Sequence, residues 1–418
     1  MKKMIIFCEN AVETLTYFSR QLAEAFEAWG YESFWMDFEM LGLSTWKLRQ
    51  ALADQRQQTE AALITFNFIG LSGEEELWDF DDEGVPCASI WEKLGIHCIN
   101  IMVDHPIYYY KALLHSVSGM QAFCIDKDHA AYMKRFYPGI PCEFLPLAGN
   151  RLLDCQVKGP GRKPEHLYEA AEAETYEQWL RRPYELVFTA NYVPISSIEN
   201  QLQQLEPEYR DFYYEMIGAF IENPAQDLLS CMEQYIRREM PELSDAELCK
   251  AMSTAPAVDL WVRTHFREQT VRVLAEGGVP VHLFGKDWEL MPCRNPENMI
   301  CSGRMINSAD CIYAMASAKA ALNTMPWFKD GAHDRIFTAM LHQTVALTDD
   351  SAYLRSQYTD QDTILYYSLH TLDELPQLAH SMLQQPEKLY AIAGRAMTET
   401  AQQHTWHHRA QTLRQYLP

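Results

Sequence analysis

Charged and polar residues of several kinds gather in one stretch of the chain, residues 323–350, which reads NTMPWFKDGAHDRIFTAMLHQTVALTDD. The apolar run AKAALN that leads into it predicts a buried strand, and TVALT predicts a second one. Between them a helix is expected to begin near His333, after a loop that contains Gly331. The stretch is therefore a strand–loop–helix–strand unit.

The loop and the helix N-terminus of such a unit face one crevice, where free N–H groups favour anions. Gly331 would let the backbone approach a ligand there. The charged side chains that fall within seven residues are Lys329, Asp330, His333, Asp334 and Arg335. This mixture predicts a site for a charged ligand. The alternative is a solvated helix start that Asp330 caps.

A second candidate site follows the apolar run HCINIMV in the first half of the chain. This run predicts a central strand, and ligands of parallel sheets are met at the carboxyl ends of strands. Asp104 and His105 occupy that end, and Pro106 fixes the turn so that both side chains project there. Alternatively, Asp104 caps the next helix and His105 is hydrogen-bonded nearby.

Two further loops in the second half follow predicted strands. Asn191 and Tyr192 come after YELVFTA, in the place where many Rossmann-like domains approach a phosphate. Gly285 and Lys286 come after VPVHLF, and Lys286 is placed to reach a diphosphate. The chain contains no G-x-G-x-x-G, so a standard dinucleotide site is disfavoured.

The run DGAHDRIFTAMLHQTVALTD, together with the C-terminal LPQLAHSMLQQPEKLYAIAGRAMTETAQQHTWHHRAQTL, resembles the donor-binding half of CgeB-like glycosyltransferases, which belong to the GT-B group. The resemblance covers most of residues 184–418 and the first half more loosely. It places Asp330 at the first acidic position of the family's motif. Thr338 stands at the second position, where a Glu usually holds the nucleotide ribose. Gly303 and Arg304 would lie beside the nucleobase.

The resemblance implies a hexosyltransferase-type glycosyltransferase that takes a nucleotide-diphosphate sugar, a UDP-sugar by preference, and uses neither a metal nor a tightly bound cofactor. Lys286, Arg335 and the backbone of residues 331–334 would neutralise the leaving diphosphate. Asp330 would hold sugar hydroxyls, and His105 or Asp104 would accept the acceptor's proton. Because Thr338 replaces the usual Glu, a catalytically inactive sugar-nucleotide or carbohydrate-binding protein is the alternative. A sugar-nucleotide epimerase is another.

The chain has 418 residues, more than one hydrophobic core normally serves, and strands alternate with helices in both halves. We expect an α/β protein of GT-B architecture, with two Rossmann-like parallel sheets facing a cleft. The expected divisions are residues 1–150 on the acceptor side, a linker at 151–183, a nucleotide-sugar domain at 184–400 and a final helix at 401–418 that returns to the first domain. A helical insertion is expected at about 198–277, where Asn223-Pro224 would open one helix and Ser244 and Glu247 would form the capping box of another. The insertion offers a surface for oligomerisation, although a scaffold role is the simpler interpretation.

The formal net charge of −22 disfavours nucleic acid and anionic membranes as partners. No stretch approaches the about eighteen unbroken apolar residues of a membrane span. The eleven cysteines are scattered singly, as expected for reduced thiols in the cytoplasm. Asp79 and Asp81 form a D-x-D that we interpret as a solvated or acceptor-facing loop. The histidines near Trp406 lack ligand spacing for zinc and fit an amphipathic helix better.

Overall fold

The computed structural model describes residues 2–53, 59–152 and 173–418. These residues form two compact units. Unit 1 holds residues 2–53, 59–148 and 404–418, and unit 2 holds residues 149–152 and 173–403. Residues 153–172 of the predicted linker, which include KGPGRKP, lie outside the described residues.

Unit 1 is built on a six-stranded sheet in the order β2-β1-β3-β6-β7-β8, in which every pairing is parallel. The strands are β1 (Lys2–Glu9), β2 (Glu32–Asp37), β3 (Thr59–Phe66), β6 (His97–Met102), β7 (Gln121–Cys124) and β8 (Cys142–Phe144). The helices are α1 (Glu13–Ala28), α2 (Leu41–Ala53), α3 (Ile90–Lys93), α4 (Tyr110–Leu114) and α5 (Lys127–Phe136), with 3-10 turns η1 (Phe38–Met40) and η2 (Pro106–Tyr109). An antiparallel hairpin, β4 (Trp78–Phe80) and β5 (Pro86–Ser89), completes the unit.

Helix periodicity explains how the helices cover this sheet. Leu15, Phe18, Leu22 and Phe26 recur at helical spacing in α1 and are all buried. The C-terminal helix α17 (Trp406–Arg414) also belongs to unit 1, where the Trp406 ring packs against Phe18 at a centroid distance of 5.1 Å. The last helix therefore completes the first unit's core.

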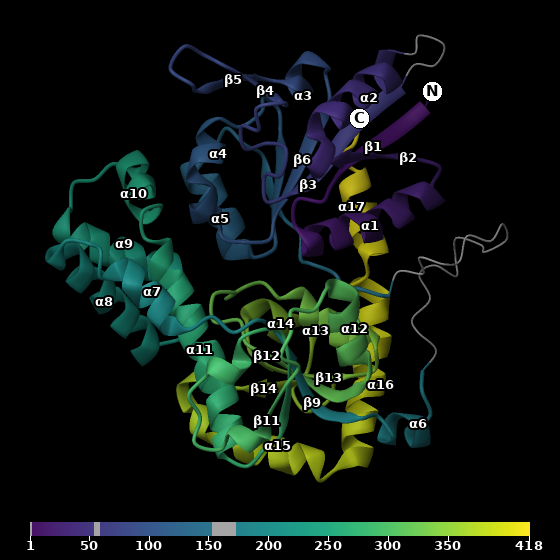
Figure 1. The fold of residues 1–418 in the computed structure, drawn as a ribbon, viewed down its shortest axis with the longest axis vertical. Helices are drawn as coiled ribbons and strands as arrows, with labels where there is room; N and C mark the ends of the chain where they lie inside the picture. Colours follow the sequence, from purple (N-terminus) through teal and green to yellow (C-terminus); the bar gives the residue numbers. More distant parts are fainter. Residues whose placement is uncertain (1, 54–58, 153–172) are drawn as a thin grey trace. The chain divides into compact units, whose positions relative to one another are not determined.

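Unit 2 is built on a second six-stranded parallel sheet, in the order β11-β10-β9-β12-β13-β14. Its strands are β9 (Tyr184–Thr189), β10 (Val281–Phe284), β11 (Met299–Cys301), β12 (Ala318–Asn323), β13 (Val345–Asp349) and β14 (Leu365–Tyr367). Its helices outside the insertion are α6 (Tyr176–Leu180), α12 (Ser308–Ala316), α13 (Asp334–Leu341), α14 (Ala352–Gln357), α15 (Leu375–Leu383) and α16 (Pro386–Gln403), with 3-10 turns η4 (Trp288–Leu290), η5 (Pro296–Asn298) and η6 (Leu369–Glu374). The expected pair of parallel α/β sheets is confirmed (Figure 1).

The connection from β9 to β10 is the predicted helical insertion. It consists of α7 (Ile195–Leu202), α8 (Pro207–Glu222), α9 (Leu228–Glu239), α10 (Asp245–Met252) and α11 (Pro256–Glu276). Helix α11 lies next to the sheet, whereas α8 to α10 project away from it (Figure 1). The capping box of Ser244 and Glu247 is present. The expectation that Asn223-Pro224 opens a helix was wrong, because α8 ends at Asn223 and the side chain of Asp227 caps α9.

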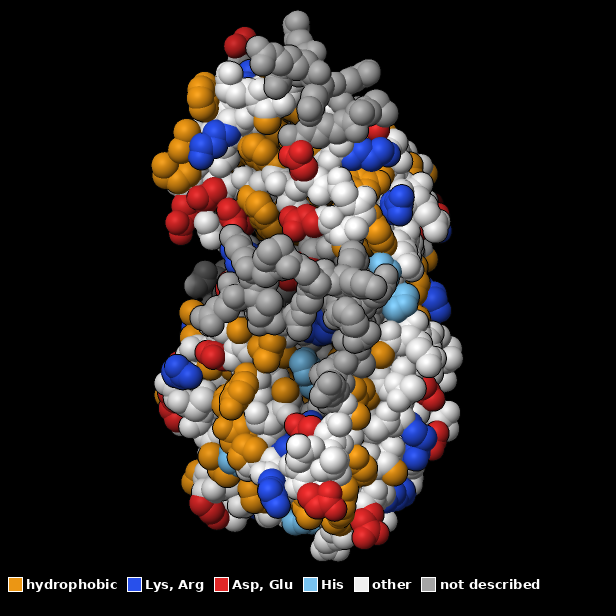
Figure 2. Space-filling view, turned by 90° about the vertical axis from the view of Figure 1, so that its right-hand side faces the viewer, with side chains coloured by type: hydrophobic (Ala, Val, Ile, Leu, Met, Phe, Trp, Pro, Cys, Tyr) orange, Lys and Arg blue, Asp and Glu red, His pale blue; other side chains and the backbone are white. Residues whose placement is uncertain are grey.

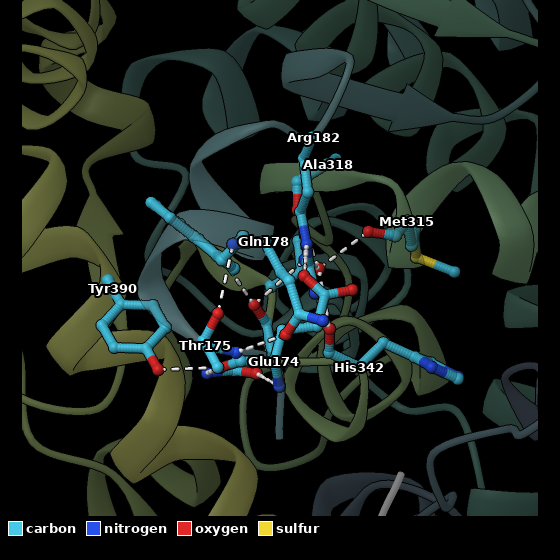
Figure 3. A network of polar contacts seen from close by, with 11 residues as sticks. Glu174, Thr175, Gln178, Arg182, Met315, Ala318, His342 and Tyr390 are labelled. Atoms are coloured by element: carbon cyan, nitrogen blue, oxygen red, sulfur yellow. Dashed lines mark hydrogen bonds and ion pairs between the residues drawn. The ribbon is translucent and has the colours of Figure 1, made fainter. Parts of the chain in front are cut away.

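One buried arginine joins the segment before β9 to the amino ends of the neighbouring strands (Figure 3). Arg182 pairs with Glu174 at 3.0 Å, and its terminal nitrogens reach three backbone carbonyls and one hydroxyl. These acceptors are Ala318 O, His342 O, Gln343 O and Thr344 Oγ1, at 2.6–3.1 Å. Burial lowers the pKa of Arg182, although Glu174 opposes this shift. The network therefore fixes the amino ends of these strands, whereas ligands of such folds bind at the carboxyl ends.

No helix among the described residues is long and apolar enough to cross a membrane. On the face drawn in Figure 2, acidic and basic side chains of the described residues are interspersed. The excess of negative charge is therefore not gathered into one patch on the visible part of that face.

Candidate functional site

The strand order of unit 2 fixes where a ligand is expected. The chain runs outward from β9 in one direction through β10 and β11, and in the other through β12, β13 and β14. The direction reverses between the adjacent strands β9 and β12, and doubly wound sheets bind ligands beyond the carboxyl ends of strands at this point. The loop after β9, the loop after β12 and the N-terminus of α13 meet there.

Arg335 lies in the first turn of α13 and reaches across to the end of β9. Its Nη1 donates to Thr189 O at 2.7 Å, and its guanidinium lies 5.6 Å from the centroid of the Phe188 ring. Burial lowers the pKa of Arg335, and the nearby carboxylate of Asp334 only partly offsets this effect. Arg335 therefore contacts the end of β9, and its predicted contact with a ligand stays a prediction.

A second arginine at this position comes from the insertion and was not anticipated. Arg267 lies on α11, about 70 residues away from Arg335 in sequence, and its Nη1 donates to Asn191 O at 3.4 Å. Its Nε is buried and has no hydrogen-bond partner among the described residues. Burial, Arg335 and Arg263 together lower the pKa of Arg267 to about 9. Like charges are therefore held near one another here.

Arg263 completes this group one helical turn before Arg267. It pairs with Asp259 at 2.7 Å, and its guanidinium lies 4.7 Å from the centroid of the Trp327 ring, on the loop after β12. Neither Arg263 nor Arg267 was predicted, because both belong to a helix of the insertion whose sequence contains nothing that resembles a ligand motif. We call Arg263, Arg267 and Arg335 the arginine cluster.

The arginine cluster and the N-terminus of α13 together have the properties of an anion site. Guanidinium groups present several donors to the oxygens of a phosphate, and the positive end of a helix dipole adds to their attraction. A bound anion would also oppose the burial and the repulsion that together lower the pKa of Arg267. The arrangement is therefore suited to a diphosphate.

The acidic and hydroxyl groups of α13 are used within the protein. His333 is the N-cap residue, and its Nδ1 lies 2.6 Å from Asp334 Oδ1. The other oxygen of Asp334 accepts from Asn150 Nδ2 at 2.8 Å. Burial favours the neutral acid, but His333, Arg335 and Asn150 lower the pKa of Asp334. Asp334 is therefore a structural anion, and His333, not Asp330, caps the helix.

Thr338 does not have the geometry of a ribose contact. It is fully buried, and its hydroxyl accepts from the backbone N–H of Asn150 at 3.0 Å and donates to Asp334 O at 2.8 Å. The segment around Asn150 approaches α13 so closely that a Cβ at Gly149 would lie 2.7 Å from Phe337 O. This contact covers the face of α13 on which Thr338 lies, which the motif spacing could not reveal.

The loops after β9 and β10 are tied to each other. Asn191 Oδ1 accepts from Lys286 N at 3.0 Å, and a Cβ at Gly285 (φ +152°) would lie 2.1 Å from Ala190 O. A side chain at position 285 would therefore collide with the neighbouring backbone, so glycine is required there. The Lys286 side chain is half exposed and lies 3.7 Å from Asp287.

Tyr192 was wrongly predicted as a ligand contact. Its ring packs on Trp288 in the core, and its hydroxyl donates to Glu268 Oε2 at 2.7 Å. The side chain therefore holds the loop after β9 against α11. This position fixes the helix that carries Arg267.

The remaining predicted residues of unit 2 lie around this crevice or at the sheet's edge. Asp330 is half-buried in the loop before α13, and Gly331 O accepts from the hydroxyl of Ser351 at 2.6 Å. Gly303 (φ +66°) and Arg304 are exposed after the edge strand β11. Arg304 Nη2 lies 4.0 Å from Asp310.

In unit 1, Asp104 and His105 do follow β6, but they differ in accessibility. His105 is 5% exposed, its Nδ1 accepts from Ile107 N at 3.0 Å, and its ring lies 4.3 Å from that of His129. His105 is therefore itself the N-cap residue of η2, whereas the alternative interpretation had expected Asp104 to be the cap. Asp104 is half-buried, and its Oδ2 accepts from Asn67 Nδ2 at 3.0 Å and from the Tyr109 hydroxyl at 3.3 Å. Its carboxylate is therefore held in position at a strand end.

The D-x-D loop and the C-terminal histidines have structural roles. Asp79 pairs with Lys93, and Asp81 Oδ1 accepts from the backbone N–H groups of Glu83 and Val85 in a turn. His404 Nδ1 contacts Arg409. Within the described residues, no group of three or more His, Cys, Asp or Glu side chains is arranged to hold a metal ion.

Residues 263–415 match the family model described as glycosyl transferase-like. No curated protein sequence matches the chain at a significant level. Among solved structures, the sucrose-phosphate synthase of Thermosynechococcus elongatus superposes with a TM-score of 0.52 at 10% identity, covering 100% of this chain and 98% of that one. Anabaena Alr3699/HepE in complex with UDP-glucose superposes with a TM-score of 0.53 at 9% identity, covering 99% of each chain. The chain therefore has the GT-B fold, and the matched family segment runs from the first residue of the arginine cluster through α17.

Proposed function

We propose that the protein is a glycosyltransferase of the hexosyltransferase type whose donor is a nucleotide-diphosphate sugar, with UDP as the nucleotide. The observation that carries this proposal is the arginine cluster, which gathers at the switch point of the second sheet beside the α13 N-terminus. The match to a glycosyl transferase-like model and the UDP-glucose complex of the similar Anabaena protein support the choice of donor.

The proposed reaction breaks the bond between the anomeric carbon and the diphosphate oxygen and forms a bond to an acceptor hydroxyl. The leaving diphosphate gains negative charge, which Arg267 and Arg335 are placed to neutralise. We therefore propose that the transfer needs no metal ion. Asp330 is assigned to the sugar hydroxyls, and Lys286 to the nucleotide side of the diphosphate.

The acceptor hydroxyl must lose its proton during transfer. We propose that Asp104 of unit 1 is the base that accepts this proton, because its half-exposed carboxylate is oriented by Asn67 and Tyr109. His105 is assigned to shaping the turn that carries Asp104, because its ring is buried. The acceptor itself is assigned only as a hydroxyl compound bound by unit 1.

The assignment to the CgeB-like subfamily is part of this proposal and rests on the run from Asp330 to Asp349. A cytoplasmic location is also proposed, because the ten described cysteines are all free.

One observation favours a second function. The buried hydroxyl of Thr338 offers no acidic contact for the ribose, which fits a protein that binds sugar nucleotides without turning them over.

Incubation with a panel of radiolabelled UDP-sugars in the presence of EDTA distinguishes these functions. A transferase is expected to release UDP slowly to water even without its acceptor, and Arg335→Gln is expected to abolish that release. An epimerised sugar would identify an epimerase. Binding of the panel without any conversion would identify the non-catalytic protein, and neither binding nor conversion would refute a sugar-nucleotide site altogether.

A further inference from the structure

Two cavities adjoin one another at the carboxyl ends of β13 and β14, which lie two and three strands away from β9 in the sheet. The first has a volume of about 470 Å³ and the second of about 400 Å³, and both are lined by Asp350 and Ser368. Each volume lies within the range of about 300–1,000 Å³ typical of small-molecule sites. No member of the arginine cluster lines either cavity. We call the pair the strand-end cavities.

From the lining of the strand-end cavities we infer a second ligand site, one that binds a neutral saccharide. The inference rests on three features: the volume of the cavities, a buried tyrosine hydroxyl without a partner among the described residues, and side chains whose charge and polarity fit hydroxyl groups better than phosphates.

The unsatisfied hydroxyl belongs to Tyr366. Its side chain is 9% exposed and lines the second cavity, and its hydroxyl is buried with no hydrogen-bond partner among the described residues. The ring is held in place, since the Arg355 guanidinium lies 4.7 Å from its centroid and pairs in turn with Asp350. A buried hydroxyl is costly to leave unsatisfied, so this atom marks a position that a ligand hydroxyl would satisfy.

Carboxylates at the strand ends are arranged to accept hydrogen bonds. Asp349 is 3% exposed, and its Oδ1 accepts from Met325 N at 2.8 Å, which fixes the orientation of the group that lines the first cavity. In the second cavity, Asp360 Oδ1 accepts from Tyr366 N at 3.1 Å, and Glu374 accepts from Thr371 at 3.1 Å. Carboxylates held in this way can accept bonds from neighbouring sugar hydroxyls.

The charge balance of the cavities separates this site from the arginine cluster. Four acidic residues line them, Asp349, Asp350, Asp360 and Glu374, whereas the basic residues are Lys329 and Arg355, with His370 beside them. Arg355 pairs with Asp350, so these two charges offset each other, and Lys329 donates to Pro224 O. The remaining acidic side chains, Asp349, Asp360 and Glu374, still outnumber the remaining basic one, Lys329. A phosphate would be repelled, and a neutral ligand with many hydroxyls is favoured.

Apolar groups lie between the polar ones. Leu369 and Pro224 line the first cavity, and Leu375 and Leu378 line the second. A pyranose presents C–H faces between its hydroxyl groups, and a lining of this mixed kind is complementary to such a ring. Because Pro224 belongs to the helical insertion, a bound saccharide would also contact the insertion.

The site is tested by saturation-transfer NMR with millimolar glucose, galactose, N-acetylglucosamine, maltose and cellobiose as probes. At least one is expected to receive saturation from the wild-type protein. Tyr366→Phe should weaken that binding by about 2–10-fold, the loss expected for one hydrogen bond. Ser368→Leu, which fills the junction of the cavities, should abolish it. The matched control Tyr313→Phe, on the exposed face of α12, should leave it unchanged.

Binding of UDP, followed on the same variants, reports on the arginine cluster and on folding. Loss of saccharide binding with UDP binding intact supports two separate sites. If Ser368→Leu fails to fold, Tyr366→Phe alone decides the outcome. The inference is overturned if none of the five saccharides receives saturation, or if their signals are the same in both cavity variants as in the wild type. Neither result depends on whether UDP binds.

Discussion

Replacement of Arg267 by Met is expected to stabilise the ligand-free protein and to weaken its binding of UDP. Methionine keeps most of the length of the side chain and removes the charge. The two effects have opposite signs because burial and the neighbouring arginines make the charge of the guanidinium costly, whereas a bound diphosphate would attract it. A residue with only a structural role would not show this combination.

The size of the first effect follows from the pKa of Arg267, which is lowered from its ordinary value to about 9. At about 1.4 kcal/mol per pH unit this shift corresponds to at most about 5 kcal/mol. Because the side chain is partly exposed, solvent screening reduces the expected gain to about 1–2 kcal/mol. Below pH 9 the group is charged in both the folded and the unfolded protein, so the full cost is present at pH 7. This cost is relieved as the pH rises from about 9 toward the ordinary pKa of an arginine.

Differential scanning calorimetry measures both effects. A gain of 1–2 kcal/mol should raise the melting temperature of unit 2 by roughly 2–8 °C. With UDP present, the loss of one charged hydrogen bond should weaken affinity by roughly 10–150-fold and reduce the stabilisation by UDP accordingly.

Arg272→Met, on the same helix, is the matched control. Arg272 pairs with Glu268, so its removal should lower the melting temperature and leave the stabilisation by UDP unchanged. An Arg267→Met protein that is less stable than the wild type, yet binds UDP with the same affinity, would refute the reasoning.

Three further predictions concern other parts of the chain. Burial raises the pKa of Asp349 from 3.8 to about 7, so ionisation of this group lowers the stability of the folded protein as the pH rises from about 4 to 7. In urea unfolding, Asp349→Asn should be more stable than the wild type by up to about 4 kcal/mol at pH 8, and by little at pH 4. Asp104→Asn should lower sugar transfer by roughly 100-fold with UDP affinity intact, whereas His105→Ala should mainly lower the melting temperature; a fully active Asp104→Asn protein would remove that residue from the chemistry. In urea unfolding, Arg182→Leu should destabilise unit 2 by about 3 kcal/mol or more, because buried carbonyls lose their donor. Arg181→Leu, at an exposed position, is the control, and equal stabilities of the two variants would contradict the role of the network.

The fold was predictable because each strand and helix carries its own local signal. Alternating apolar runs and helical periodicity place both sheets, and the long helical stretch after β9 is visible as an insertion. Asn223-Pro224 misled the assignment of one helix because Pro can follow a helix as well as open one, and only the Asp227 cap distinguishes the two.

The candidate site was predictable only where its residues follow strands. Arg335 could be proposed as a site residue because it opens the helix after a buried strand, whereas Arg263 and Arg267 come from a helix whose packing depends on the whole unit. Tyr192 was misassigned because the sequence does not show that Glu268 lies beneath it. Thr338 was misassigned because Asn150, which covers it, is 188 residues away in sequence.

Isothermal titration of the wild-type protein with UDP and with UMP, both in EDTA, tests most directly whether the arginine cluster binds a diphosphate. The β-phosphate is the group that the cluster is proposed to hold, and each charged hydrogen bond to it is worth about 1.5–3 kcal/mol. With two guanidinium groups engaged, UDP is expected to bind at a single site at least about 100-fold more tightly than UMP. Equal affinities for UDP and UMP, or binding of UDP that appears only after magnesium is added, would contradict the proposed site.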